Sequence, residues 1–230
     1  MKGVSLNLSA RFGHFKRPET SNNPCTYSYM HKVAFIGLMG AVVGIHRDRM
    51  KNMYPDLCDD LLYSVELLKP VQKEGLGFTK RKVTPENFFH AGQRYQEVLR
   101  NPSYCITVAL LHHRSVQTFE SFMDLIKKGQ THYPIYFGIA SCPCSIREVK
   151  EVSVSDKKTG RSTVHSVFSA EHEIVDMSDD TELIYERIPT HCVDHMYTPG
   201  RIVETVCPTV PIVVEGDYYT INDSTDVWMM

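Results

Sequence analysis

Residues 12–44 read FGHFKRPETSNNPCTYSYMHKVAFIGLMGAVVG, which joins the end of a predicted strand to a proline-punctuated loop and then to an apolar helix. The loop carries Lys16, Arg17 and Tyr27 with a single acidic residue, Glu19, and it contains no cluster of metal-ligand residues. This composition is typical of a surface that contacts phosphate groups and not of a hydrolase pocket.

The helix predicted over residues 33–50 is apolar on almost all sides, so it must be buried on most of them. Gly37, Gly40 and Gly44 would each weaken an exposed helix by about 1 kcal/mol relative to alanine, which indicates that another backbone or a ligand comes very close. Gly40 and Gly44 are predicted to share a face. The uncharged run over residues 33–45 is shorter than the ~20 residues of a membrane span, so no membrane partner is expected.

Three motifs in this stretch, FGHFKRPET, TYSYM and GLMGAVVG, together resemble the amino-terminal signature of the Cas-five family. Members of this family are RAMP proteins that cap the 5′ end of the guide RNA in type I CRISPR Cascade complexes. The resemblance is closest to type I-B members, is strongest over residues 3–49 and continues to about residue 140. It implies a non-catalytic subunit that holds the 5′ handle of crRNA and contacts the backbone subunit and the large subunit. Target DNA would then be read by pairing with the guide and not by this chain.

Length and composition fit a globular protein with one sizeable core, or one domain and a smaller appendage, because 42% of the 230 residues are hydrophobic. No signal-peptide pattern follows Met1, so the protein is expected to be cytoplasmic. Residues 1–114 have a formal charge of +7 and residues 115–230 have −9. Such an imbalance suggests that the first half faces a polyanion, although chance clustering of surface charge would also produce it.

Seven scattered cysteines do not have the spacing of a secreted disulfide scaffold and are expected to be reduced thiols. The pair Cys142 and Cys144 is too close for the common structural zinc site, and Cys192 lies between two histidines in HCVDH at residues 191–195. Neighbouring prolines indicate a loop there, interpreted as a surface or partner contact. No metal and no cofactor is therefore expected, and no Walker A loop, nucleophile elbow or dinucleotide fingerprint is present.

The order of predicted elements gives the fold class. Strands are predicted over residues 3–12, 61–68, 95–111 in two pieces, and 133–140, with a second helix beginning at Ser115 and ending at Gly129. Together with the first helix they form the βαββαβ order of a ferredoxin-like (RRM/RAMP) α+β domain over residues 1–145, whose open sheet is a platform for single-stranded RNA. About 25 residues after residue 68, with Lys80, Arg81 and Lys82 at their centre, are predicted to form a projecting basic arm. Residues 146–230 are predicted to form a β-rich subdomain that packs against protein partners.

The predicted RNA-binding residues combine phosphate-contacting cations with stacking aromatics. They are Arg11, His14, Lys16, Arg17, Tyr27, Lys32, Arg47, Lys80, Arg81, Lys82, Arg94 and Tyr95. The amides at the start of the first helix are expected to add a phosphate contact.

Two alternatives stay open at this point. One is a metal-independent endoribonuclease that processes precursor crRNA, as in type I-C members of the family, which use a tyrosine, a lysine and a histidine. Tyr27 would be the tyrosine in this chain, but no lysine-histidine pair matches, because His112 and His113 have no lysine beside them. The other is a pure protein-interaction module, in which the basic half docks an acidic partner instead of RNA.

Overall fold

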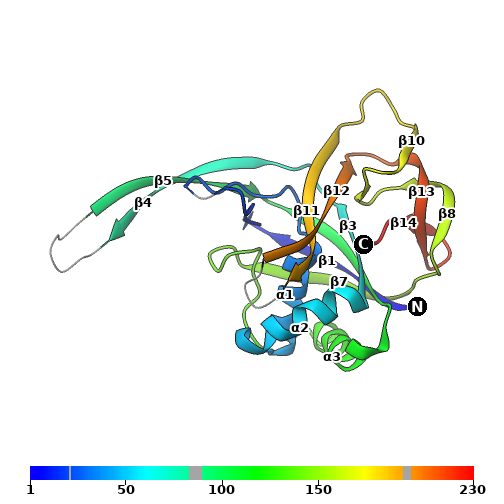
Figure 1. Cartoon of the computed structure of the whole chain (residues 1–230), viewed down its shortest axis with the longest axis horizontal. Helices are drawn as coiled ribbons and strands as arrows, with labels where there is room; N and C mark the ends of the chain where they lie inside the picture. The colour runs from blue at the N-terminus through cyan, green and yellow to red at the C-terminus, as the bar shows by residue number, and fades with distance from the viewer. Residues whose placement is uncertain (21, 83–89, 194–197) are drawn as a thin grey trace.

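The computed structural model describes residues 1–20, 22–82, 90–193 and 198–230, and the side chains at 80–91 and 193–199 lie outside what it describes. The chain is a mixed α+β protein made mostly of strands (Figure 1). A four-stranded antiparallel sheet with the order β3-β6-β1-β7 forms its centre. Its strands are β1 (Lys2–Ala10), β3 (Leu61–Leu67), β6 (Ser103–Leu110) and β7 (Cys144–Ser153).

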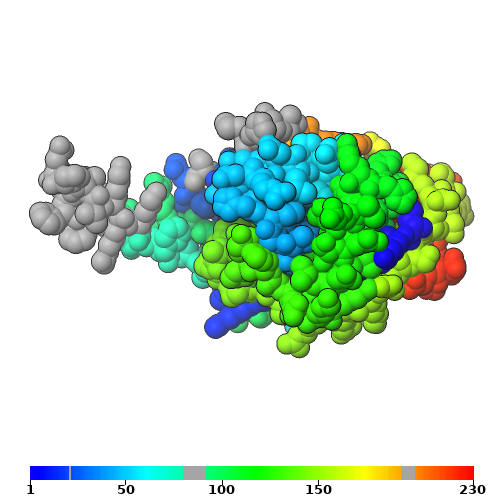
Figure 2. Space-filling view, turned by 90° about the horizontal axis from the view of Figure 1, so that it is seen from below, coloured from blue at the N-terminus to red at the C-terminus, as the bar shows by residue number. Residues whose placement is uncertain are grey.

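One face of this sheet packs against helices and forms the main core. Alternation in β1 places Val4, Leu6 and Leu8 on this face, and all three are fully buried. Helix α1 (Lys32–Val43) and helix α3 (Val116–Lys127) contribute Phe35 and Phe122, whose rings meet edge to face at 5.8 Å. In the view of Figure 2, α2 (Arg47–Asp60) and α3 cover this side of the molecule.

The first helical segment is two helices and not the single helix predicted over residues 33–50. Helix α1 ends because Gly44 adopts a left-handed conformation (φ +82°) and its N–H donates to the Gly40 carbonyl at 3.0 Å. Helix α2 then begins at Arg47, and His46 caps it because its Nδ1 accepts a hydrogen bond from the Asp48 N–H. Pro55 lies inside α2, which continues to Asp60.

The last strand of the central sheet also differs from the prediction. Residues 133–140 form bends with one isolated bridge, from Tyr136 to Pro143, and Gly138 has φ +81° against the carbonyl of His14, where a Cβ would lie 1.9 Å from that oxygen. Strand β7 takes the edge position beside β1 instead, so the predicted boundary at residue 145 falls inside a strand. Ser115 precedes α3 as predicted, but its hydroxyl donates to Asp60 Oδ2 at 2.6 Å and does not cap the helix.

The second face of the central sheet is partly covered by the carboxy-terminal strands. Leu62, Ala109 and Val152 on this face pack against Tyr219 and Val227 from the last strands of the chain. The remaining positions on β1 are polar, namely Ser5, Asn7 and Ser9. The open RNA-stacking sheet expected from the sequence is therefore not formed by the described residues of this face, because Tyr63 and Tyr104 point into the helical core.

A long hairpin extends away from the rest of the molecule (Figure 1). It consists of β4 (Lys73–Lys82) and β5 (His90–Arg100), paired in register from Lys73 opposite Leu99 to Lys82 opposite His90, and β2 (Phe12–Gly13) pairs with the base of β5. The stretch predicted to form a basic arm contains β4 and the start of β5. Residues 83–89 and the side chains of Lys80, Arg81 and Lys82 lie outside the described residues.

The carboxy-terminal region is rich in strands. Strands β11 (Leu183–Val193) and β12 (Thr198–Pro208) pair with each other and, at β12, with β9 (Phe168–Ser169). A second sheet contains β8 (Lys158–Val164), β10 (Glu173–Asp176), β13 (Ile212–Ile221) and β14 (Thr225–Val227). The consecutive strands β7 and β8 do not pair with each other, because β7 pairs with β1 and β8 pairs with β13. Among the described residues, no helix is long and apolar enough to cross a membrane.

Candidate nucleic-acid interface

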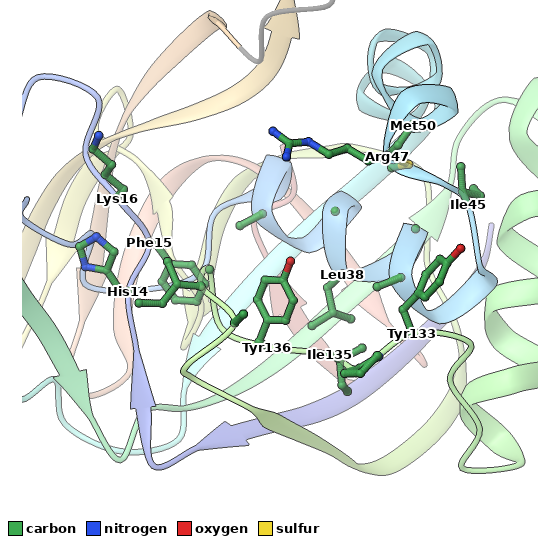
Figure 3. A pocket seen from close by; sticks show the side chains of 18 of the residues that line it. His14, Phe15, Lys16, Leu38, Ile45, Arg47, Met50, Tyr133, Ile135 and Tyr136 are labelled. Atoms are coloured by element: carbon green, nitrogen blue, oxygen red, sulfur yellow. The ribbon is translucent and has the colours of Figure 1, made fainter. Parts of the chain in front are cut away.

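A cleft of about 850 Å³ lies between α1, the start of α2, residues 14–16 and residues 133–140 (Figure 3). Its floor is apolar and includes Leu38 and Ile135. Lys16 and Arg47 lie on its border, and none of its described lining residues is an aspartate or glutamate. A concave surface with cations and no carboxylates favours an anionic ligand over a cationic one.

Small residues on α1 make room for this cleft and for helix α2 beside it. Gly37 and Gly40 line the cleft, and a Cβ at these positions would lie 2.7 Å from Tyr54 Oη and 2.7 Å from Met50 Sδ, respectively. The close approach predicted from the glycines therefore comes from side chains of α2. Gly44 does not share a helical face with Gly40, because it ends the helix, and it packs against the ring of His132.

Two tyrosines form the aromatic wall of the cleft. Tyr133 and Tyr136 are both exposed and point toward the cleft in Figure 3. The backbone of this wall is fixed to α1, because the N–H groups of His132 and Tyr133 donate to the carbonyls of Val42 and Ala41 at 3.0 Å each. Exposed aromatic rings beside cations are the usual means of binding single-stranded nucleic acid. The sequence contains these tyrosines, but their segment was predicted to be a strand, so they were not assigned to the site.

The opposite end of the cleft carries His14 and Lys16. His14 is buried and its Nδ1 donates to the Glu97 carbonyl at 2.7 Å, which fixes the ring against the base of the hairpin. Burial lowers the pKa of His14, so the ring is neutral at pH 7. Lys16 is exposed, and its backbone pairs with Thr26. Of these two predicted residues, Lys16 is the one that presents a charge to a ligand.

The start of α1 is also at the cleft, but its first amides are already satisfied in part. His31 Nδ1 accepts a hydrogen bond from the Ala34 N–H at 3.2 Å and so caps the helix. Burial lowers the pKa of His31 to about 3, which keeps the ring neutral. The predicted phosphate contact with the amides at this helix start therefore has to compete with the His31 cap.

Arg17 and Tyr27, which were predicted to contact RNA, make their contacts inside the protein. Glu186, buried on β11, accepts hydrogen bonds from Arg17 Nη2 at 2.5 Å, from Ser28 Oγ at 2.6 Å and from the Ser28 N–H at 3.1 Å. The Arg17 guanidinium lies 5.3 Å from the ring centre of Tyr27, and Tyr27 is only 3% exposed. Arg17 thus ties the loop to β11, and Tyr27 has no accessible face for a base. Sequence reasoning missed Glu186, since nothing local distinguishes it from the other acidic residues of the strand.

Lys32 is likewise inside the protein. It is 3% exposed and its Nζ donates to the Met230 carbonyl at 2.9 Å. Burial lowers its pKa to about 8. Lys32 was predicted to contact RNA, and in this structure its amine holds the end of the chain against α1 and does not face solvent.

The remaining predicted residues are distributed between the hairpin and its surroundings. Tyr95 and Arg94 are exposed on β5, and Arg94 Nη1 donates to Asn22 Oδ1 at 3.4 Å. Arg11 is exposed, with its guanidinium over the ring of Phe12 at 5.5 Å. The structure thus brings together His14, Lys16, Arg47, Gly37 and Gly40 in the cleft, while Arg94 and Tyr95 form part of the neighbouring hairpin.

The described residues give little support for a metal site or for a nuclease site. No group of three or more histidine, cysteine, aspartate or glutamate side chains suited to a metal occurs among them. The HCVDH motif was expected in a loop, but His191 and Cys192 belong to β11. His191 Nε2 forms a hydrogen bond with Asp59 Oδ1 at 3.1 Å. Asp194 and His195 lie outside the described residues. Burial raises the pKa of Tyr27 to about 12, which disfavours the tyrosine proposed for RNA cleavage.

Comparisons with known proteins were made at the level of sequence and of structure. The family model described as CRISPR-associated protein (Cas_Cas5) matches residues 3–209. A CRISPR protein from Archaeoglobus fulgidus has a similar structure, with a TM-score of 0.60 and 15% identity over 99% of this chain and 98% of that one. A chain of a CRISPR RNA-guided surveillance complex is similar with a TM-score of 0.56 and 12% identity over 93% and 91% of the two chains. No curated protein matches the sequence significantly. At these identities the structural likeness establishes a shared fold.

Proposed function

The chain belongs to the Cas5 family of CRISPR-associated proteins, and we propose on this basis that it is a subunit of a type I Cascade complex that binds the 5′ handle of crRNA. In this proposal the protein is non-catalytic, acts in the cytoplasm, and is most similar to the type I-B members. It contacts the backbone subunit and the large subunit, and it meets target DNA only through the complex.

The observation that carries the proposal is the chemistry of the cleft. It combines an apolar floor, two exposed tyrosines and the cations Lys16 and Arg47, with no carboxylate among its described lining residues. Bases stack on aromatic side chains and phosphates pair with cations, so one surface of this kind can hold a single RNA strand without base pairing. In Figure 3, Arg47 reaches from the start of α2 toward the side of the cleft on which Lys16 lies.

The strand order supports a ferredoxin-like domain for this subunit. The order β7-β1-β6-β3, with α1 and α2 between β1 and β3 and with α3 between β6 and β7, is the arrangement of a split βαβ unit. Fold alone does not determine function, so the proposal depends on the cleft and on the family.

The ribonuclease alternative is less well supported by the geometry. Its tyrosine, Tyr27, is buried against Arg17 and His31, so it cannot approach a ribose hydroxyl in this conformation. His14 and His31 are held neutral by burial and already make hydrogen bonds. Cleavage activity is tested in the same experiment as binding.

The test is fluorescence anisotropy with an end-labelled, repeat-derived 5′-handle RNA and a scrambled RNA of equal length, both in EDTA, for the wild type and Lys16→Glu. Lys150→Glu on β7 is a matched control, because it changes an exposed lysine outside the cleft. We expect preference for the handle, and a loss of at least about ten-fold in affinity for Lys16→Glu only. Equal binding of both RNAs contradicts handle recognition, and shortened RNA on a denaturing gel identifies a nuclease.

A further inference from the structure

A second, smaller pocket lies at the base of the β4–β5 hairpin. It has a volume of about 220 Å³ and lies between the loop residues Asn23–Cys25 and the hairpin residues 73–75 and 95–97. Pockets for drug-sized ligands are about 300–1,000 Å³, so this one accepts a group no larger than a single ring system. It is separate from the cleft, but residues 14–16 of the same loop line the cleft, so the loop lies between the two.

One face of the hairpin is built to leave this pocket open. Tyr95 pairs with Gly77 across the two strands, and Gly75 lies two residues earlier in β4 on the same face. A Cβ on Gly77 would be 3.4 Å from Cε1 of Tyr95, whereas a Cβ on Gly75 would have no atom within 4 Å. The Tyr95 ring therefore rests on Gly77 and is 58% exposed, with open space beside it.

The opposite wall is held in place by hydrogen bonds. The N–H of Glu97 donates to the Pro24 carbonyl at 3.0 Å, and Glu97 Oε1 accepts from the N–H of Thr26 at 3.0 Å. Lys73 Nζ donates to the Thr26 carbonyl at 3.0 Å. The pocket is thus preformed, which reduces the entropy lost when a ligand enters it.

The chemistry of the lining indicates what the pocket accepts. Lys73 and Glu97 both line it, lie 3.7 Å apart and are both bonded to the backbone of Thr26, so the lining residues offer no unpaired cation to a phosphate. The side-chain amide of Asn23 offers hydrogen bonds to the edge of a planar ring, and Tyr95 offers a stacking surface. A neutral heteroaromatic ring satisfies both conditions, while its sugar and phosphate stay outside.

We propose that this pocket holds one unstacked nucleobase of the bound RNA strand, with Tyr95 stacking on the base. The proposal rests on the proposed function, because it requires that RNA pass over the loop between the cleft and the hairpin. It adds a site that reads a base, whereas the cleft contacts the strand through aromatic rings and cations.

The test measures the affinity of the repeat-derived handle RNA and of a series in which one base at a time is replaced by an abasic site. The variants are Tyr95→Ala, which removes the stacking ring, and Gly75→Val, which fills the pocket. Gly75 is in an extended strand with free space around its Cβ position, so the valine does not strain the fold. Phe78→Ala is the matched control, since Phe78 is 46% exposed on the other face of the same hairpin.

We expect one abasic position to reduce affinity about ten-fold in the wild type and in Phe78→Ala, and less than about two-fold in Tyr95→Ala and Gly75→Val. If every abasic position costs the same in all four proteins while handle RNA is still preferred, the base pocket is refuted and the proposed function stands. If Tyr95→Ala and Phe78→Ala weaken binding equally, the hairpin contacts RNA without a pocket, which also refutes it. If the wild type does not prefer handle RNA, the proposed function itself fails.

Discussion

Replacing Arg17 with alanine should destabilise the protein, whereas replacing its neighbour Lys16 should not. The two residues are adjacent in the basic loop and both were predicted from the sequence to contact phosphates. Arg17 pairs with the buried Glu186, whereas Lys16 is exposed and forms no ion pair with a carboxylate among the described residues. The comparison therefore separates a structural cation from a ligand-binding one.

The magnitude follows from what Arg17→Ala leaves behind. The variant loses a 2.5 Å charged hydrogen bond to Glu186, a 3.3 Å bond to the Thr26 carbonyl and the contact with the Tyr27 ring. A hydrogen bond to a charged group contributes about 1.5–3 kcal/mol, and removing one partner of a fully buried pair costs about 3–5 kcal/mol. Arg17 is 29% exposed and Glu186 keeps its two bonds from Ser28, so the lower range applies. We expect a loss of about 2 kcal/mol, or about 4–8 °C in Tm.

Urea unfolding followed by tryptophan fluorescence measures this difference. Trp228 is the only tryptophan and is 9% exposed, so its emission reports the loss of the folded core. Lys16→Ala should change the free energy of unfolding by less than about 0.5 kcal/mol. If Arg17→Ala is as stable as Lys16→Ala, within about 0.5 kcal/mol, the Glu186 pair does not hold the loop and our assignment of Arg17 is wrong.

Two further predictions concern α1. Because burial lowers the pKa of His31 to about 3, the unfolded chain binds a proton that the folded one does not, so stability falls as pH drops below about 6.5. Asparagine keeps a helix-capping oxygen but does not titrate. Urea unfolding at pH 7 and at pH 5 should therefore show that His31→Asn loses about 2 kcal/mol less free energy of unfolding between the two pH values than the wild type does. An unchanged pH dependence would contradict this. Gly40→Ala should lower the free energy of unfolding by about 1–3 kcal/mol in the same assay, because the new Cβ would lie 2.7 Å from Met50 Sδ. Gly75→Ala should lower it by less than about 1 kcal/mol, because the space around that Cβ is open. Equal costs for the two alanine variants would show that Met50 moves aside freely.

Local patterns in the sequence were sufficient for the elements that depend on local physics. Alternation identified β1, because Val4, Leu6 and Leu8 must share one face of a strand, and three-and-four spacing identified α3. The run of apolar residues around Phe35 correctly indicated a buried helix. Its end was misplaced, because Gly44 was interpreted as part of a packing face when its left-handed backbone stops the helix.

Long-range contacts explain what could not be predicted from the sequence. Arg17 and Glu186 are 169 residues apart, and only the fold shows that they pair. In the sequence, nothing distinguishes Tyr27 from an exposed aromatic residue of a basic loop. Only the fold shows that it is buried. Tyr136 was placed in a strand because the contacts that force turns there, between Gly138 and His14, are invisible in one sequence. The family resemblance, by contrast, required only the motif combination in residues 12–44, and the match over residues 3–209 agrees with it.

The most direct test of the central claim is to find where the handle RNA lies on the protein. The repeat-derived handle RNA, substituted with 4-thiouridine, is bound to the purified chain, crosslinked with long-wavelength light and mapped by mass spectrometry. If the cleft is the RNA site, crosslinked peptides should contain residues 133–140 and the loop that carries Lys16. Crosslinks confined to the β8–β10–β13 sheet, on the carboxy-terminal region, would contradict the account.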